Sequence, residues 1–97
     1  MADEPRKFRD KRLRQFAEGF RVKDFHSFEQ QLDKRLKILE EAATRDDLRR
    51  LPSNHFEALR GDRKGQFSIR INKQWRLCFE WPAGADHAFN IEVVDYH

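Results

Sequence analysis

Hydrophobic and polar positions alternate with two different periods along the chain, one typical of helices and the other typical of strands. In the first half, apolar residues recur at helical spacing at four positions: Leu13, Phe16, Ala17 and Phe20. They predict a short helix over roughly residues 10–18, which Gly19 ends, and a short strand over residues 5–9 in front of it.

A second and longer helix is predicted over residues 27–44. Ser27 and Gln30 have the spacing of a capping box, in which each side chain accepts a hydrogen bond from the other residue's backbone. Five apolar residues then lie along one face: Phe28, Leu32, Leu36, Leu39 and Ala43. Residues 46–50 are expected to add one more helical turn before the breaker sequence of residues 51–54.

From Gln66 onward the apolar period is two, which predicts strands. Three alternating runs carry this pattern: Phe67 to Ile71, Trp75 to Trp81 and Phe89 to Val93. We expect an α+β fold in which N-terminal helices pack on one face of a small, mainly antiparallel sheet. Trp75 and Trp81 have the parity of this covered face. The other face is expected to be polar, with Ser68, Arg70, Asn72 and Arg76, and its arginines must be either solvated or paired.

Length and composition indicate a single intracellular domain. The 97 residues are enough for one domain, covering residues 1–97, with a modest core. No apolar run approaches the roughly 20 residues that span a bilayer, and the first residues lack the apolar stretch of a signal peptide. Cys78 is the one cysteine, which fits a reducing cytoplasm, and we expect it to be a packing residue. No metal-ligand cluster and no glycine-rich nucleotide loop occurs, so neither a metal nor a cofactor is expected.

The net charge is only +3, but the cations are concentrated in two blocks. One block lies between Arg6 and Arg14, where six cations face Asp10 alone. In the other, Asp62 alone faces six cations: Arg60, Arg63, Lys64, Arg70, Lys73 and Arg76. Such clustering indicates an anionic partner, and a phosphate backbone is the leading candidate. For the N-terminal block, a merely solvated surface is an equally good interpretation.

The C-terminal residues Asp95, Tyr96 and His97 place a carboxylate, a phenol and an imidazole in succession. RNA is cut without a metal when its 2′-hydroxyl attacks the adjacent phosphate, which needs a base, an acid and cationic donors. Asp95 and His97 are candidates for proton transfer, and Tyr96 for base stacking or proton transfer. Arg76 is the candidate for stabilising the phosphorane charge. Because Tyr96 and its two neighbours alternate in strand parity, their convergence requires the strand to end, twist or bulge near Val94.

Three segments carry a resemblance to a known family. They are the run LRGDRKGQFSIRIN over residues 59–72, the run QWRLCF over residues 74–79 and the ending VVDYH. The sequence resembles the HigB branch of the RelE/ParE superfamily, the bacterial type II toxins also called plasmid maintenance killer proteins. The similarity is close over residues 51–97 and concerns mainly the order of elements before them.

The resemblance implies a compact RelE-like fold and a ribosome-dependent, metal-independent endoribonuclease that cleaves mRNA in the decoding site. It also implies a cytoplasmic toxin bound by a HigA-like antitoxin, whose helix-turn-helix domain binds DNA, so that the toxin meets DNA only indirectly. The family's catalytic residues fall on Asp95, Tyr96, His97 and Arg76, and its basic residue before Gly-Asp falls on Arg60. We expect four further cations in RNA binding: Arg63, Lys64, Arg70 and Lys73.

One departure from the family pattern leaves part of the chemistry open. Some members place a histidine just before the Leu-basic-Gly-Asp turn, where it takes part in cleavage. Here Glu57 stands near that register and His55 lies two residues earlier, so either is a possible substitute, or the C-terminal residues act alone.

Two other functions share these features: a ParE-like toxin that binds DNA gyrase without catalysis, and an RNA-binding module with a silent groove. The Asp-Tyr-His ending favours the nuclease, since binding alone has no need of proton-transfer groups.

Overall fold

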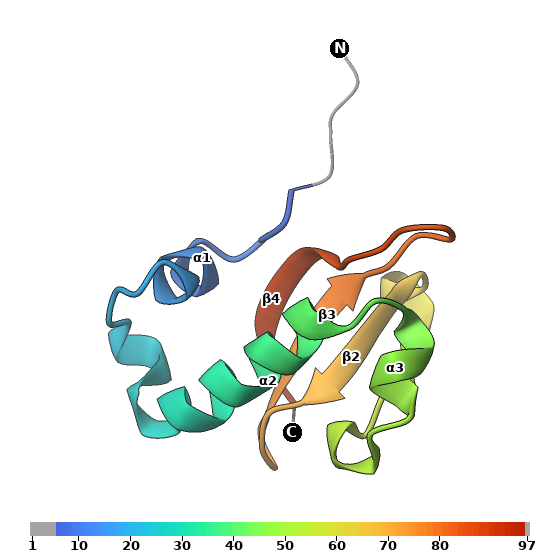
Figure 1. Ribbon diagram of the computed structural model, residues 1–97. Coiled ribbons are helices and arrows are strands. Elements are labelled where there is room, and N and C mark those ends of the chain that lie inside the picture. Colours follow the sequence, from blue (N-terminus) through green and yellow to red (C-terminus); the bar gives the residue numbers. More distant parts are fainter. Residues whose placement is uncertain (1–5, 97) are drawn as a thin grey trace.

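The computed structural model describes residues 6–96, which form three α-helices packed against a four-stranded antiparallel sheet (Figure 1). The helices are α1 (Lys11–Ala17), α2 (Glu29–Glu41) and α3 (Arg45–Arg49). The strands are β1 (Glu57–Ala58), β2 (Gln66–Arg70), β3 (Trp75–Glu80) and β4 (Phe89–Asp95), and they neighbour one another in that order. Three 3₁₀ turns connect them: η1 (Lys23–Phe28), η2 (Pro52–Asn54) and η3 (Gly61–Arg63). The predicted α+β class is confirmed.

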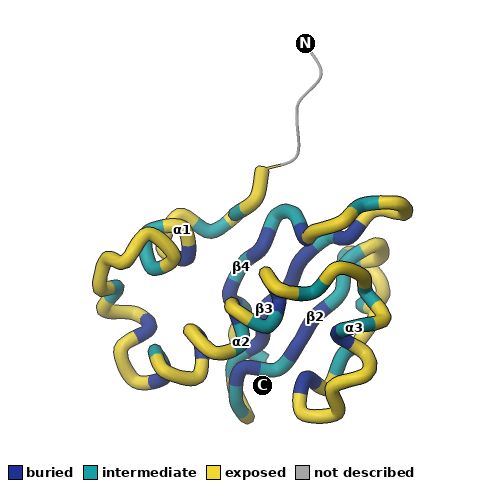
Figure 2. The backbone as a smooth tube through the Cα atoms, in the orientation of Figure 1, coloured by how far each residue is buried: buried dark blue, intermediate teal, exposed yellow. Residues whose placement is uncertain are grey.

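The core lies between the helices and the apolar face of the sheet. Helix α2 buries Leu32, Leu36 and Leu39, and its apolar face therefore matches the predicted one. Ile69 of β2 and Leu77 of β3 are fully buried in the same cluster, and burying each such side chain stabilises the fold by about 1.5–3 kcal/mol. In Figure 2 most of β3 and part of β2 are dark blue, whereas the helices are mainly yellow. Within residues 6–96 no helix has the length and apolarity needed to cross a membrane.

Two predicted boundaries in the helical half are wrong. Ser27 lies inside η1, so α2 begins at Glu29 and no side-chain hydrogen bond caps it. The reason is the deep burial of Phe28, which stacks on Trp75 with ring centroids 5.0 Å apart and holds the segment in a 3₁₀ turn. At the other end α2 stops at Glu41 and leaves Ala43 exposed. The backbone there must extend so that Thr44 can cap α3.

The strand predicted over residues 5–9 is reduced, within the described part of the chain, to one parallel bridge between Phe8 and Ile91. Pro5 lies outside the described residues. The backbone N–H of Ile91 donates to the carbonyl of Lys7 at 3.0 Å, and that of Arg9 donates to the carbonyl of Ile91 at 3.0 Å. The segment therefore covers part of the outer edge of β4, but it is too short to form a strand.

Asp10 joins α1 to the sheet. Its carboxylate caps α1 by accepting from the backbone N–H groups of Arg12 and Leu13, and it also accepts from the N–H of Val93 in β4 at 3.4 Å. Burial alone would raise the pKa of Asp10, but the hydrogen bonds and charge of the Arg12 guanidinium more than offset this and lower it. The ionised carboxylate is therefore the form that stabilises the fold.

Replacing Asp10 by Ala should lower the free energy of unfolding by about 1–2 kcal/mol, the usual effect of losing an N-cap. Asp10→Asn should lose less, because Asn caps helices well and lacks only the charge. Since the pKa of Asp10 is lowered in the folded state, its charge-dependent stability is present above the unfolded-state pKa and is lost as the pH falls through the folded-state value. Urea unfolding at neutral pH and at about pH 3 should therefore show the difference between wild type and Asp10→Asn shrinking on acidification. A difference that stays constant would contradict this role.

A bulge in β4 changes which side chains face the core. The register shifts between Cys78 and Glu80 of β3, and Asn90 opposite them has a left-handed backbone with φ 50°. Phe89 consequently pairs with Glu80 on the polar face. The prediction that Phe89 shares the core face with Ile91 and Val93 is therefore wrong. Beyond the bulge the pairing is regular as far as Asp95.

Candidate active site

The polar face of the sheet is largely covered, and its central arginine is paired rather than solvated. Ser68 and Cys78 are fully buried, and only 8% of Arg76 is exposed. An ion pair between Arg63 and Glu92, at 3.4 Å, forms part of the charged layer around this face. Burial raises the pKa of the Cys78 thiol to about 11, so this side chain is a neutral packing group at physiological pH.

Arg76 is held from several sides. Its Nε donates to the Oγ of Ser68 at 2.9 Å, and its Nη2 donates to the carbonyl oxygen of His55. Its Nη1 lies 3.6 Å from a carboxylate oxygen of Glu57, and the guanidinium carbon lies 5.6 Å from the centroid of the Tyr96 ring. A guanidinium with this many neighbours has a fixed position and a charge that is only partly neutralised.

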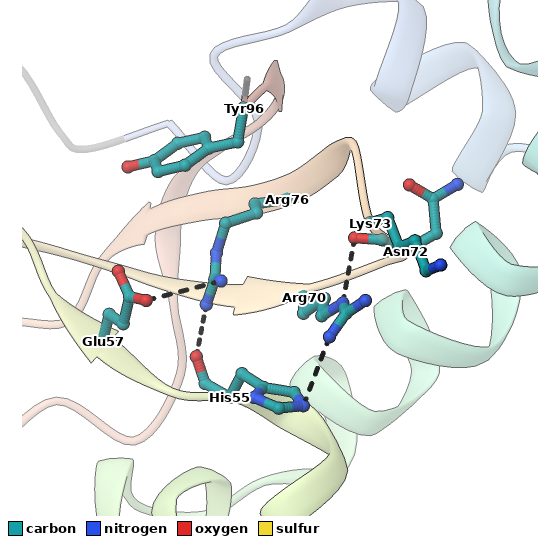
Figure 3. Close-up of a pocket in the computed structure, with 7 residues that line it drawn as sticks. All are labelled: His55, Glu57, Arg70, Asn72, Lys73, Arg76 and Tyr96. Atoms are coloured by element: carbon teal, nitrogen blue, oxygen red, sulfur yellow. Dashed lines mark hydrogen bonds and ion pairs between the residues drawn. The ribbon is translucent and has the colours of Figure 1, made fainter.

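The side chains around Arg76 form a pocket, with a cavity of about 350 Å³. Figure 3 shows Arg76 between the Tyr96 ring above it and the His55 carbonyl below it. The lining comes from the η2–β1 connection, from β1, from the β2–β3 hairpin and from the residue after β4: His55, Glu57, Arg70, Asn72, Lys73, Arg76 and Tyr96. Three cations therefore share one small cavity with a carboxylate, an imidazole and a phenol. This combination suits a phosphate whose charge changes while protons move.

Arg70 and Arg76 lie directly opposite each other on β2 and β3, as their shared parity predicted. Arg70 donates from Nε to the carbonyl of Asn72 at 3.1 Å, and its Nη1 lies 3.5 Å from the Nε2 of His55. Lys73, at the tip of the same hairpin, also lines the pocket. Two of the predicted RNA-binding cations, Arg70 and Lys73, therefore line the same pocket as Arg76.

The other predicted RNA-binding cations lie elsewhere. Arg60 and Lys64 flank η3 and are exposed, but neither lines the pocket. Arg63 is half-buried and donates to Gln66 and Glu92 at 3.1 and 3.4 Å. It therefore holds η3 on the sheet. Three cations of the N-terminal block are similarly engaged within the fold, through ion pairs that include Lys7–Glu40, Arg9–Glu92 and Arg12–Asp24.

Of the three C-terminal candidates, the structure describes Tyr96 and Asp95, and only Tyr96 lies in the pocket. Tyr96 lines the pocket, and burial raises the pKa of its phenol, which stays protonated. Asp95 pairs with Trp75 on the opposite face of the sheet, and its carboxylate accepts from Gln74 at 3.1 Å. Strand β4 ends at Asp95, one residue after Val94, and its bulge lies earlier, at Asn90. His97 lies outside the described residues, and the catalytic roles of Asp95 and His97 remain predictions.

One pocket residue, Asn72, was not predicted to belong to the site, although its polar-face parity was visible in the sequence. Its Oδ1 accepts from the backbone N–H groups of Gln74 and Trp75, at 2.8 and 2.9 Å, and so shapes the hairpin that presents Lys73. Among residues 6–96 no group of three or more histidine, cysteine or acidic side chains is placed to hold a metal ion.

His55 occupies an unusual backbone conformation at the edge of the pocket, with φ 45° and ψ 52°. This left-handed region costs a non-glycine residue about 1–2 kcal/mol. His55→Gly should therefore be more stable than His55→Ala by about 1 kcal/mol, even though both variants lack the imidazole. Chemical unfolding of the pair measures this difference directly, and equal stabilities would show that the conformation is not maintained in solution.

The arrangement of helices, sheet and pocket defines the class of protein. Three helices on one face of a four-stranded antiparallel sheet, with a cationic pocket on the other face, form a RelE-like α+β domain. A family model described as "RelE-like toxin of type II toxin-antitoxin system HigB" matches residues 6–97. Toxin HigB-1 of Vibrio cholerae serotype O1 is 46% identical over 79 residues, which cover 79% of this chain and 83% of that protein. The chain therefore belongs to the HigB-like toxins of type II toxin–antitoxin systems, and membership implies an antitoxin partner.

Proposed function

We propose that this toxin is a ribosome-dependent endoribonuclease that cleaves mRNA by metal-independent acid–base chemistry and so inhibits translation. The observation that carries the proposal is the pocket around Arg76, in which cations and proton-transfer groups face one cavity. Family membership supports the same conclusion. A surface that only bound RNA would need the cations, but it would gain nothing from a carboxylate placed beside them.

In the proposed reaction, a base removes the proton of the RNA 2′-hydroxyl, whose oxygen attacks the adjacent phosphorus. The bond from phosphorus to the 5′-oxygen breaks, and an acid protonates that leaving oxygen, which gives a 2′,3′-cyclic phosphate and a 5′-hydroxyl. Arg76 stabilises the negative charge that accumulates on the phosphorane, and Arg70 and Lys73 bind the phosphates next to it. The Tyr96 ring offers a stacking surface beside Arg76.

Glu57 is our candidate for the base, in the place where some family members carry a histidine. Its carboxylate lies 3.6 Å from Arg76, and 54% of its side chain is exposed, so it can reach a substrate and the phosphorane-stabilising group together. The His55 ring contacts Arg70 instead, at 3.5 Å. We assign the role of the acid to His97, because imidazole suits proton transfer near neutral pH and the residue directly follows Tyr96 in the chain.

The proposed partners follow from this reaction. The ribosome positions the mRNA, and exposed cations such as Arg60 and Lys64 contact ribosomal RNA phosphates. A HigA-like antitoxin with a helix-turn-helix domain is the proposed neutralising partner, and DNA is contacted through that protein. The proposed site of action is the cytoplasm.

Mapping of mRNA ends tests the proposal. Purified toxin is added to ribosomes stalled on a defined mRNA, to the same mRNA without ribosomes, and to DNA gyrase in a supercoiling assay. We expect new 5′ ends within the decoding site, and only in the presence of ribosomes. Inhibition of gyrase without cleavage would establish the ParE-like alternative, and ribosome binding without cleavage would establish the silent module.

A further inference from the structure

Arg35 of α2 reaches from the helical layer to the turn that carries His55. Its Nη1 donates to the Oδ1 of Asn54 at 2.9 Å and to the Oγ of Ser53 at 3.2 Å. Arg35 is half-buried, and it is a guanidinium on a helix whose other inward-facing residues are mainly leucines. No sequence motif drew attention to it.

Asn54 connects Arg35 to the pocket. It is fully buried, and its Nδ2 donates to the carbonyl of Leu48 at 3.0 Å, so both ends of its amide are engaged. The next residue is His55, which is forced into the left-handed conformation and has its N–H bonded to the carbonyl of Pro52. From that position the His55 carbonyl accepts from Arg76, and its ring contacts Arg70. An unbroken series of hydrogen bonds and peptide links thus joins Arg35 to the two arginines of the pocket.

The positive charge of Arg35 is electrostatically unfavourable at this position. Burial lowers the pKa of its guanidinium, and the nearby charge of Arg70 lowers it further. Among residues 6–96 no carboxylate lies within ion-pair distance of Arg35 or of Arg70. A methionine or leucine would fill the same space without repulsion, so the geometry of the two hydrogen bonds is what the charged side chain provides.

We propose that Arg35 is a positioning residue of the active site, which fixes Asn54 and the left-handed His55 so that the His55 carbonyl and ring hold Arg76 and Arg70 toward the substrate. The inference rests on the proposed function in that the activity positioned is mRNA cleavage. Arg35 itself does not line the pocket and touches no reacting atom. Misplacing a catalytic group by about 1 Å costs on the order of 10²-fold in rate, which sets the upper end of the effect expected from its loss.

The test compares Arg35→Met, which removes both hydrogen bonds, with Arg35→Lys, which keeps one donor and the charge. Lys34→Met is the matched control, because Lys34 is exposed on the same helix and its loss changes the net charge equally. The first readout is the NMR signal of the Arg76 Nε–H group, which donates to Ser68 in the isolated toxin. The second is single-turnover cleavage of ribosome-bound mRNA at saturating toxin, with the toxin concentration for half-maximal rate measured separately.

We expect Arg35→Met to shift the Arg76 signal and speed its exchange with water. Its saturated cleavage rate should fall about 10- to 100-fold, with less than about a threefold change in the half-maximal concentration, because the pocket cations still bind the ribosomal substrate. Arg35→Lys should recover most of the rate, and Lys34→Met should behave as wild type. An unchanged Arg76 signal in folded Arg35→Met would overturn the proposal. So would a saturated cleavage rate that falls as far in Arg35→Lys as in Arg35→Met. A wild-type toxin that did not cleave mRNA would overturn the proposed function alone, because the NMR comparison tests Arg35 without any substrate.

Discussion

Replacing His97 by Ala should slow mRNA cleavage on the ribosome by about 10²- to 10⁴-fold, the usual contribution of a general acid or base. The imidazole is the side chain best matched to protonating a leaving oxygen near neutral pH. It follows Tyr96, whose ring already lies beside Arg76. Binding to the ribosome and to the antitoxin should be unchanged, because the substitution removes no cation of the pocket. Single-turnover cleavage over a range of pH measures the effect, and the limb of the profile that belongs to the histidine should disappear.

His87→Ala is the matched control for this prediction. His87 is exposed, lies outside the pocket around Arg76 and has Asp86 as its hydrogen-bond partner at 2.6 Å. It should cleave at the wild-type rate. If His97→Ala cleaved within a few-fold of wild type, the acid would have to be sought elsewhere, and Tyr96 would be the next residue to replace.

Replacing Arg76 by Lys should slow saturated cleavage by about 10²- to 10³-fold, the typical effect of losing one donor to transition-state charge. Lysine keeps the charge but cannot bond Ser68, the His55 carbonyl and a phosphate together, because it lacks the planar fork of arginine. Arg76→Ala should be destabilised as well, by about 1–3 kcal/mol, since it leaves buried polar groups without a partner. Ribosome binding should weaken far less than the rate in either variant. Melting temperature and single-turnover cleavage, measured together, separate the two effects.

Arg63→Lys provides the comparison for Arg76. Arg63 is another partly buried arginine near the same sheet face, but its ion-pair partner is Glu92 and it does not line the pocket. It should lose stability and keep its saturated cleavage rate. If Arg76→Lys behaved in the same way, destabilised and fully active, Arg76 would be a structural residue whose ion pair with Glu57 only supports the fold.

The local elements could be predicted from the sequence because their signals are local. The leucines of α2 and the alternation of β2 and β3 report directly which face of each element is buried. The helix start at Ser27 was wrong because the burial of Phe28 against Trp75, a contact between distant segments, overrides a local capping pattern. The capping box that forms lies at Thr44 and Asp47, which have the same spacing, with aspartate in place of the usual glutamate or glutamine.

The site was only partly predictable, and the reason is three-dimensional. Strand parity placed Arg70 and Arg76 on one face, and Tyr96 was a candidate because of the Asp-Tyr-His ending; all three line the pocket. The burial of Arg76 and its ion pair with Glu57 depend on the pairing of β1 with β2, and β1 has only two residues and no hydrophobic alternation. The contribution of Arg35 depends on a helix crossing over a turn nearly twenty residues further along the chain, which no spacing rule contains.

The sequential order of the strands has a consequence for the synthesis of the toxin. Because β1, β2, β3 and β4 pair in chain order, each hairpin can form as soon as its second strand has been made, and contacts of this local kind favour rapid folding. The pocket draws all of its lining from residues 55–96, and Tyr96 is supplied only after β4. A nascent chain that lacks β4 has an unpaired edge on β3, which favours association with other chains. The pocket is therefore complete only after β4 has been made and has paired with β3, because a chain that lacks β4 and Tyr96 lacks one wall of the pocket.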